Sequence, residues 1–313
     1  MDFVTLSIIF FSIAIAIDIL YSKKDRIITF KKAFVWSFIW IFVSIIFIIV
    51  AHELKVNDFF TLMAIYLTEK ILSINNLSIF LLIFSLTKIN IREKLKVLTF
   101  GIYISIILRI MLIFIGTLLV KTFLNISYLL ISILLLFFGY SMIKEKNEFL
   151  NRFLYLIEIF GKNISKEVTQ KFPMFHLSFS KLITLIFLIG IVNFIFSLDN
   201  AFSVLVISSD FISLLVTTLL AVIGLKPLYF LLENVAKKVE KLKLFLGIYM
   251  FYLAFESFLK VFGIEIPNSI TICVLLTLIS IPIILHFSKD FTPSHKRKEK
   301  IEEKSSYKNY KNY

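Results

Sequence analysis

Two polar insertions interrupt otherwise apolar stretches of this chain, and together their side chains are suited to binding a cation. In the first, Ser73 and Asn76 follow Glu69 at helical spacing, and the second centres on Asp199. Such side chains are costly in hydrocarbon and stay mainly where they face a bundle interior or water. An all-oxygen donor set suits Mn²⁺, Mg²⁺ or Ca²⁺ better than zinc or copper, which prefer nitrogen and sulfur. The candidate metal ligands are Glu69, Ser73, Asn75, Asn76, Ser197, Asp199 and Asn200.

The two insertions share one pattern, which predicts an internal duplication. Residues 72–76 read Leu-Ser-Ile-Asn-Asn, and residues 196–200 read Phe-Ser-Leu-Asp-Asn. A second pair of segments, around Arg109 and around Lys226, also matches. The insertions fall on the third and sixth apolar stretches, so the two copies would cross a membrane in opposite directions. We predict inverted halves at about 59–143 and 182–262, a plan that recurs in secondary transporters and places the substrate site near the midplane.

Simpler interpretations of the same residues stay open. Ser and Asn in membrane helices often only hydrogen-bond one helix to another. The carboxylates of Glu69 and Asp199 could pair with Arg109 and Lys226, which we interpret as supporting counter-charges rather than substrate contacts. The two acids also have the chemistry to exchange protons. Glu256 is a further acid in an apolar stretch, with no counterpart in the other half.

Composition predicts an all-α, polytopic membrane bundle that these residues would line. Of 313 residues 59% are hydrophobic, and the mean hydropathy is +0.92. The apolar runs have roughly the length that a helix needs to cross a bilayer. We predict about nine transmembrane helices, with the following bounds: 3–21, 33–51, 59–86, 97–120, 123–143, 182–208, 211–233, 244–262 and 270–287.

The distribution of basic residues predicts the orientation of this bundle. The net charge is +13, and Lys and Arg gather in alternate connections between the predicted helices. Positive-inside logic places the N-terminus outside and the C-terminus in the cytoplasm. We therefore predict a transmembrane domain at 1–288 and a basic, disordered cytoplasmic tail at 289–313 that contacts anionic lipid.

Several function classes receive no support from the sequence. The four His residues and the single Cys273 form no metal-ligand spacing, and the basic residues form no nucleic-acid-binding face. Signatures of zinc hydrolases, nucleophile elbows and phosphate-binding loops are lacking, and only 8 Gly are present. We expect neither an enzyme nor a bound cofactor. The expected partners are the lipid bilayer and a divalent ion as substrate, while the oligomeric state is left open.

The polar segments resemble those of the TerC family of integral membrane proteins, which includes Alx-type manganese exporters. Residues 69–77 (Glu-Lys-Ile-Leu-Ser-Ile-Asn-Asn-Leu) resemble the family's Glu-Lys-x-Leu-Ser-x-Asp-Asn-Leu. Residues 196–200 resemble its Phe-Ala-x-Asp-Ser, and residues 225–230 its Leu-Arg-x-Leu-Tyr-Phe. The resemblance covers about residues 18–262 and implies an inner-membrane metal exporter, most plausibly for manganese, in a family first linked to tellurium resistance.

The departures from that family pattern affect the expected function. Asn75 stands where the resemblance implies an acid, and Gly190 and Asn193 stand at two further acidic positions. With fewer carboxylates, the site should hold a divalent ion less tightly. The alternative function is therefore a TerC paralogue that no longer transports and acts as a membrane scaffold or interaction protein.

Overall fold

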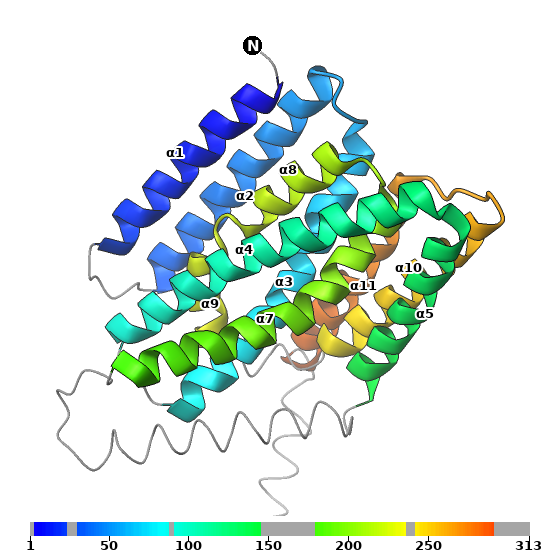
Figure 1. The fold of residues 1–313 in the computed structure, drawn as a ribbon. Helices are drawn as coiled ribbons and strands as arrows, with labels where there is room; N and C mark the ends of the chain where they lie inside the picture. The colour runs from blue at the N-terminus through cyan, green and yellow to red at the C-terminus, as the bar shows by residue number, and fades with distance from the viewer. Residues whose placement is uncertain (1–2, 24–29, 88–90, 145–178, 236–241, 291–313) are drawn as a thin grey trace, which may run out of the picture.

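The structure is a computed structural model that describes the chain except for residues 1–2, 24–29, 88–90, 145–178, 236–241 and 291–313. The described part is a bundle of helices with no strand (Figure 1). The helices are α1 (Phe3–Lys23), α2 (Phe30–Glu53), α3 (Phe59–Thr87), α4 (Ile91–Thr122), α5 (Leu124–Ile143), α7 (Phe179–Ile207), α8 (Phe211–Val222), α9 (Leu225–Val235), α10 (Leu242–Val261) and α11 (Asn268–Asp290).

The predicted all-α membrane bundle is confirmed, whereas the number of nine spans stays a prediction. Helices lie at all the predicted positions, but the described residues yield four that are long and apolar enough to cross a membrane: α2, α4, α5 and α10. A fifth is added if α8 and α9 form one bent span. The tail from residue 291 onward and many of the basic connections lie outside the described residues, so their predicted roles stay untested.

The bundle turns apolar side chains outward and polar ones inward. Large side chains such as Phe42, Ile107 and Ile126 are at least 65% exposed, whereas Glu69 and Asp199 are at most 2% exposed. A soluble protein rarely shows so much apolar surface. The outward residues are suited to lipid contact, and the buried polar residues need partners inside the protein.

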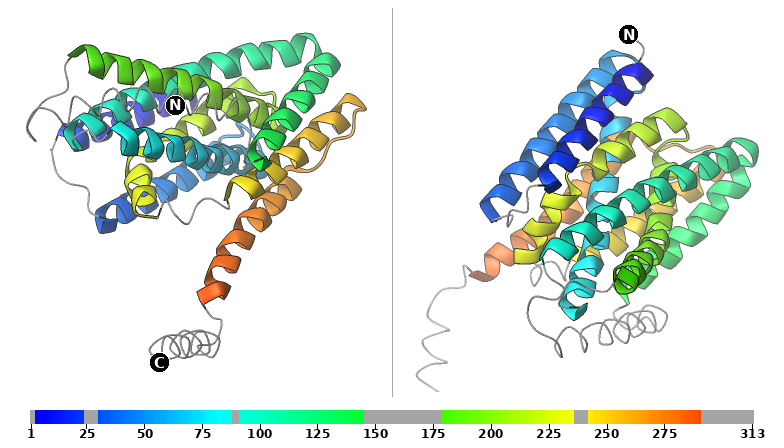
Figure 2. Two further views of the ribbon diagram at one scale, coloured as in Figure 1. Left: turned by 90° about the horizontal axis from the view of Figure 1, so that it is seen from below. Right: turned by 60° about the vertical axis from the view of Figure 1, so that its left-hand side comes forward.

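The contacts among six of the helices show an approximate symmetry, while the bounds of the two predicted halves stay a prediction. α4 packs along α7, and α3 packs along α8; α3 also contacts α7, and α5 packs closely on α10 (Figure 1). An exchange of α3 with α7, α4 with α8 and α5 with α10 maps this set of contacts onto itself. An inverted repeat predicts this pattern. The remaining helices lie around this arrangement, and the C-terminal part of α11 extends away from the bundle (Figure 2).

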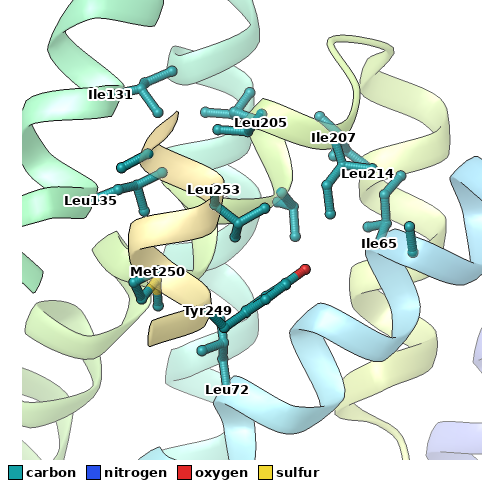
Figure 3. Packing of buried hydrophobic residues seen from close by; sticks show 14 of the residues in the cluster. Ile65, Leu72, Ile131, Leu135, Leu205, Ile207, Leu214, Tyr249, Met250 and Leu253 are labelled. Atoms are coloured by element: carbon teal, nitrogen blue, oxygen red, sulfur yellow. The ribbon is translucent and has the colours of Figure 1, made fainter. Parts of the chain in front are cut away.

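Three apolar clusters surround the polar residues of the bundle. One lies among α3, α5, α7 and α10, and includes Leu72, Leu205 and Leu253 (Figure 3). A second joins the C-terminal part of α3 to α4 and α9. A third joins α2, α3 and α8, where α1 adds Phe10, whose ring centroid lies 4.5 Å from that of Phe47. The packing in these clusters holds together the helices that carry the polar side chains.

The predicted span 211–233 is interrupted. α8 ends at Val222, α9 begins at Leu225, and the two helix axes differ by 44°. Gly224 between them has φ +80°, a left-handed conformation that disfavours side chains with a Cβ. A Cβ at this position would also lie 2.7 Å from Cβ of Trp40. The break therefore depends on a glycine that α2 covers closely.

Candidate functional site

Glu69 lies at the centre of the buried polar residues, where α3, α4, α7 and α8 meet. Its side chain has no exposed surface, and Arg109 donates from Nη1 to Oε2 at 2.5 Å. Thr218 on α8 donates to Oε1 at 3.1 Å. Both carboxylate oxygens therefore have partners, which offset the cost of placing the carboxylate away from water.

Arg109 contacts two residues of the motif on α3, Glu69 and Ser73. It comes from the middle of α4, is 1% exposed, and donates from Nη2 to Ser73 Oγ at 3.1 Å. Ser73 lies one helical turn after Glu69, so one guanidinium reaches both residues. Its planar, forked arrangement of donors suits this double contact better than a lysine would.

Asp199 and Asn200 approach the same point from α7. One end of the Asn200 amide lies 2.6 Å from Arg109 Nη2 and 3.4 Å from Glu69 Oε2, and the other end lies 3.2 Å from Asp199 Oδ1. Its oxygen toward Arg109 and its nitrogen toward Asp199 satisfy these neighbours best. Asp199 is 2% exposed, and its Oδ1 also accepts from the backbone N–H of Asn200 at 2.8 Å. The two predicted acids thus belong to one buried network, joined by Asn200 and Arg109.

Of the other predicted ligands, Asn76 borders this network, and Asn75 and Ser197 are buried on the same two helices. Asn75 and Asn76 are each 6% exposed on α3, and Asn76, Ser73 and Arg109 line a cavity of about 10 Å³. Such a volume is near the minimum for one water molecule. Ser197 is fully buried, and its Oγ has no hydrogen-bond partner within the described part of the chain. Ser197 and Asn200 are three residues apart, which places them on one face of α7.

Lys226 does not occupy a position equivalent to that of Arg109, its predicted counterpart in the repeat. It lies in the first turn of α9, is 5% exposed, and its Nζ lies 5.6 Å from the centroid of the Tyr103 ring. This cation–π contact directs the charge toward α4. Glu256, the acid without a repeat counterpart, is buried on α10 and accepts from Thr271 on α11 at 3.0 Å.

Two residues of this region were not among the predicted site residues. Thr218 donates to Glu69 from α8, but threonine in an apolar helix gives no specific pattern to detect. Lys70 lies within the first motif, next to Glu69, but was not predicted as a site residue. Its Nζ donates to the carbonyls of Ala221 and Ile223 at 2.9 and 2.8 Å. A lysine in the middle of an apolar stretch is itself a functional signal.

The charge of the network limits the ions that it can accept. Two carboxylates and one guanidinium meet there, with amide and hydroxyl oxygens around them. Within the described ranges, no three His, Cys, Asp or Glu side chains come together to hold a metal. A cation entering here would find oxygen donors only, and it would compete with Arg109 for Glu69.

The family model of the integral membrane protein TerC family matches residues 54–297, which include this entire network. The chain belongs to the TerC family. It is 27% identical over 279 residues to an uncharacterized membrane protein of Rickettsia prowazekii, covering 85% of this chain and 93% of the relative. The predicted family is thereby confirmed.

Two other relatives carry a more specific name. Proteins named putative membrane-bound redox modulator Alx are 28% identical over 253 residues in Photorhabdus laumondii and 25% identical over 295 residues in Escherichia coli K12. These matches cover 75% of this chain and 78% of the first relative, and 88% of this chain and 91% of the second. No solved structure matches this TerC protein.

Proposed function

We propose that this TerC protein moves a divalent cation, most plausibly Mn²⁺, out of the cytoplasm across the inner membrane. The observation that carries the proposal is the network in which Glu69, Asp199 and Asn200 meet from helices of opposite halves. Buried acids at such a junction are costly and mark ion pathways in membrane proteins. Their all-oxygen surroundings favour a hard cation.

In this proposal Arg109 is the partner that the transported ion replaces. The guanidinium neutralises Glu69 when no ion is bound, which keeps the buried carboxylate tolerable. A divalent ion that binds Glu69 and Asp199 would displace Arg109 toward Ser73 or the adjacent cavity. Ser197 and Asn200 would supply neutral oxygens from α7, while Asn75 and Asn76 would supply them from α3. Alternating access would follow from movement of one half against the other.

The experiment is Mn²⁺ uptake into proteoliposomes that contain a metal-sensitive dye. Glu69→Gln and Asp199→Asn are each expected to reduce uptake to the level of protein-free vesicles, because each removes a charged ligand while retaining the shape of the side chain. Glu265→Gln is the matched control, since that acid is exposed in the connection between α10 and α11. Uptake that is unchanged in both site variants would remove the assignment.

A membrane scaffold is the second candidate, and one observation favours it. Glu69 already has a charged partner and a hydroxyl donor, so the network could serve only to hold four helices together. This function predicts that no ion flux occurs in the unmodified protein. It also predicts that Glu69→Gln changes thermal stability or the co-purification of partners.

The name of the Alx relatives suggests a redox role, but the sequence of this chain gives that role little support. Disulfide chemistry within one chain needs two cysteines, and Cys273 is the only cysteine in the sequence. We therefore derive no redox step for this TerC protein and favour ion transport.

A further inference from the structure

The end of α8 leaves backbone carbonyls inside the bundle without helical partners. The last four carbonyls of any helix lack intrahelical donors, and the helix dipole makes that end negative. α8 ends at Val222, and the chain turns at Ile223 and Gly224 before α9 begins. In a membrane interior water cannot freely satisfy these oxygens, so the protein has to supply a positive group.

Lys70 supplies that group from α3. Its Nζ donates to the Ala221 carbonyl at 2.9 Å and to the Ile223 carbonyl at 2.8 Å, and the side chain is only 8% exposed. The ammonium thus lies against the terminal oxygens of a broken helix. Carbonyl oxygens at the ends of half-helices coordinate cations in several transporter folds. The break has the chemistry of a cation site, and a side chain of the same protein occupies it.

The type of oxygen indicates which free ion this arrangement would accept. The distances of 2.9 and 2.8 Å are those of ordinary N–H···O hydrogen bonds, so a group of the size of ammonium fits against the Ala221 and Ile223 carbonyls. The two donors are neutral carbonyls, which replace the hydration shell of a monovalent ion in potassium-selective pores. The arrangement therefore fits a monovalent cation of the size of ammonium, such as NH₄⁺ or K⁺.

A cavity adjoins the break and offers space for such an ion and its water. It measures about 40 Å³, and Val222, Ile223, Gly224 and Lys226 line it together with Trp40 and Tyr103. A volume of this size exceeds the minimum for one water molecule. Removal of the Lys70 side chain would add space on the α3 side of the same carbonyls.

We propose that the break between α8 and α9 is a monovalent-cation site that the Lys70 ammonium occupies as a tethered cation. When the tether is removed, free NH₄⁺ or K⁺ binds the same carbonyls. Lys70 is then a positioning residue, because it fixes the end of α8 one turn beyond Thr218, the hydroxyl that contacts Glu69. The unmodified protein carries its own cation and needs none from solution at this point.

The test is thermal melting of the purified full-length protein in chloride salts of ammonium, potassium and choline at equal ionic strength. The unmodified protein should melt at the same temperature in all three salts. Lys70→Ala should melt lower in choline and regain stability in ammonium or potassium, with a saturable dependence on concentration that reflects ligand binding to the folded state. Lys70→Met should lose stability without regaining it, because its side chain fills the space and offers no donor.

Lys94→Ala is the matched control for the loss of a lysine. Lys94 pairs with a carboxylate, Glu233, near the surface, so its loss should give no difference between ammonium and choline. Equal melting of Lys70→Ala in all salts would overturn the proposal. If Lys70→Ala can be purified only in ammonium or potassium, the proposal is supported; if it fails in every salt while Lys70→Met is recovered, the proposal is overturned. The readout is stability, so the result is independent of whether Mn²⁺ is transported.

Discussion

The two predicted halves of this TerC protein use corresponding helices differently. In the first half, α4 runs unbroken from Ile91 to Thr122 and carries Arg109 into the buried network. In the second half, the corresponding segment breaks into α8 and α9, and Lys226 contacts the ring of Tyr103 instead. The continuous helix delivers a charge to the site, whereas the broken helix presents carbonyls and receives a charge from Lys70. α4 therefore brings a positive charge to Glu69, whereas the end of α8 presents carbonyl oxygens to Lys70.

The largest expected effect is the difference in stability between a variant of Arg109 and a variant of Lys226. Arg109→Ala leaves the Glu69 carboxylate buried without its charged partner, and breaking one side of a buried pair costs about 3–5 kcal/mol. Lys226→Ala removes contacts that include a cation–π contact worth about 0.5–2 kcal/mol, and it leaves the pair of Glu69 and Arg109 intact. Thermal melting of both purified variants checks the ranking. An equal loss of stability in both variants would show that Arg109 and Lys226 contribute equally to the stability of the bundle, against this account.

A double variant sharpens the same point. Replacing both partners of a buried ion pair by apolar residues is often neutral or stabilising. Glu69→Leu combined with Arg109→Met should therefore recover much of the stability that Arg109→Ala loses. If the double variant melts as low as the single one, the cost does not arise from an unpaired carboxylate.

The next largest effect is expected at the contact between α5 and α10, where one glycine of each helix lies against the backbone of the other. A Cβ on Gly139 would lie 2.9 Å from the carbonyl oxygen of Gly247, and a Cβ on Gly247 would lie 2.9 Å from that of Gly139. The obstacle is backbone, so Gly139→Ala has to push the helices apart, at about 1–3 kcal/mol. A melting temperature that equals that of the unmodified protein would contradict this close approach.

The break in the second half gives a smaller effect of a different kind. Gly224→Ala places a Cβ on a left-handed residue against Trp40, and the backbone conformation alone costs about 1–2 kcal/mol. Gly190→Ala on α7 is the control: its Cβ would meet Ile104 at 3.8 Å, and alanine favours the helix by up to about 1 kcal/mol. Opposite signs in thermal melting are expected, and stabilisation by both substitutions would argue against a break at Gly224.

The smallest effect lies at the surface, where α4 and α9 meet. Lys94 Nζ lies 2.5 Å from Glu233 Oε1, but the two side chains are 15% and 38% exposed. Solvent screens such a pair, so Lys94→Ala should cost at most about 1 kcal/mol, and less at high salt. A loss as large as that of Arg109→Ala would show that this surface pair, too, sets the position of α9.

The sequence was sufficient to predict the positions of the helices and most residues of the network, though not Thr218, because both follow from local patterns. Apolar runs fix where helices lie in a membrane, and the spacing of Glu69 and Ser73 fixes their common face. The family could also be predicted, since its motifs are short and specific. The predicted convergence of Glu69 and Asp199 rested on two short internal matches, and the network joins them through Asn200 and Arg109.

The break in α8–α9 and its partners were harder to predict. Gly224 and Pro227 lie three residues apart and mark a possible interruption, yet hydropathy alone describes residues 211–233 as one apolar run. Arg109 and Lys226 look equivalent in sequence, but the bend redirects Lys226 toward Tyr103. The contact of Lys70 with α8 depends on tertiary packing of helices about 150 residues apart, which no local pattern encodes.

The central claim is that the network joining Glu69 to Asp199 accepts a divalent ion in place of Arg109. The most direct measurement is an anomalous-scattering map from crystals of the protein soaked in Mn²⁺. The account predicts one strong peak between α3 and α7, bonded to Glu69 and Asp199, with the Arg109 guanidinium moved off Glu69. A map with no peak there and the Arg109–Glu69 pair intact, from protein that transports Mn²⁺, would contradict it.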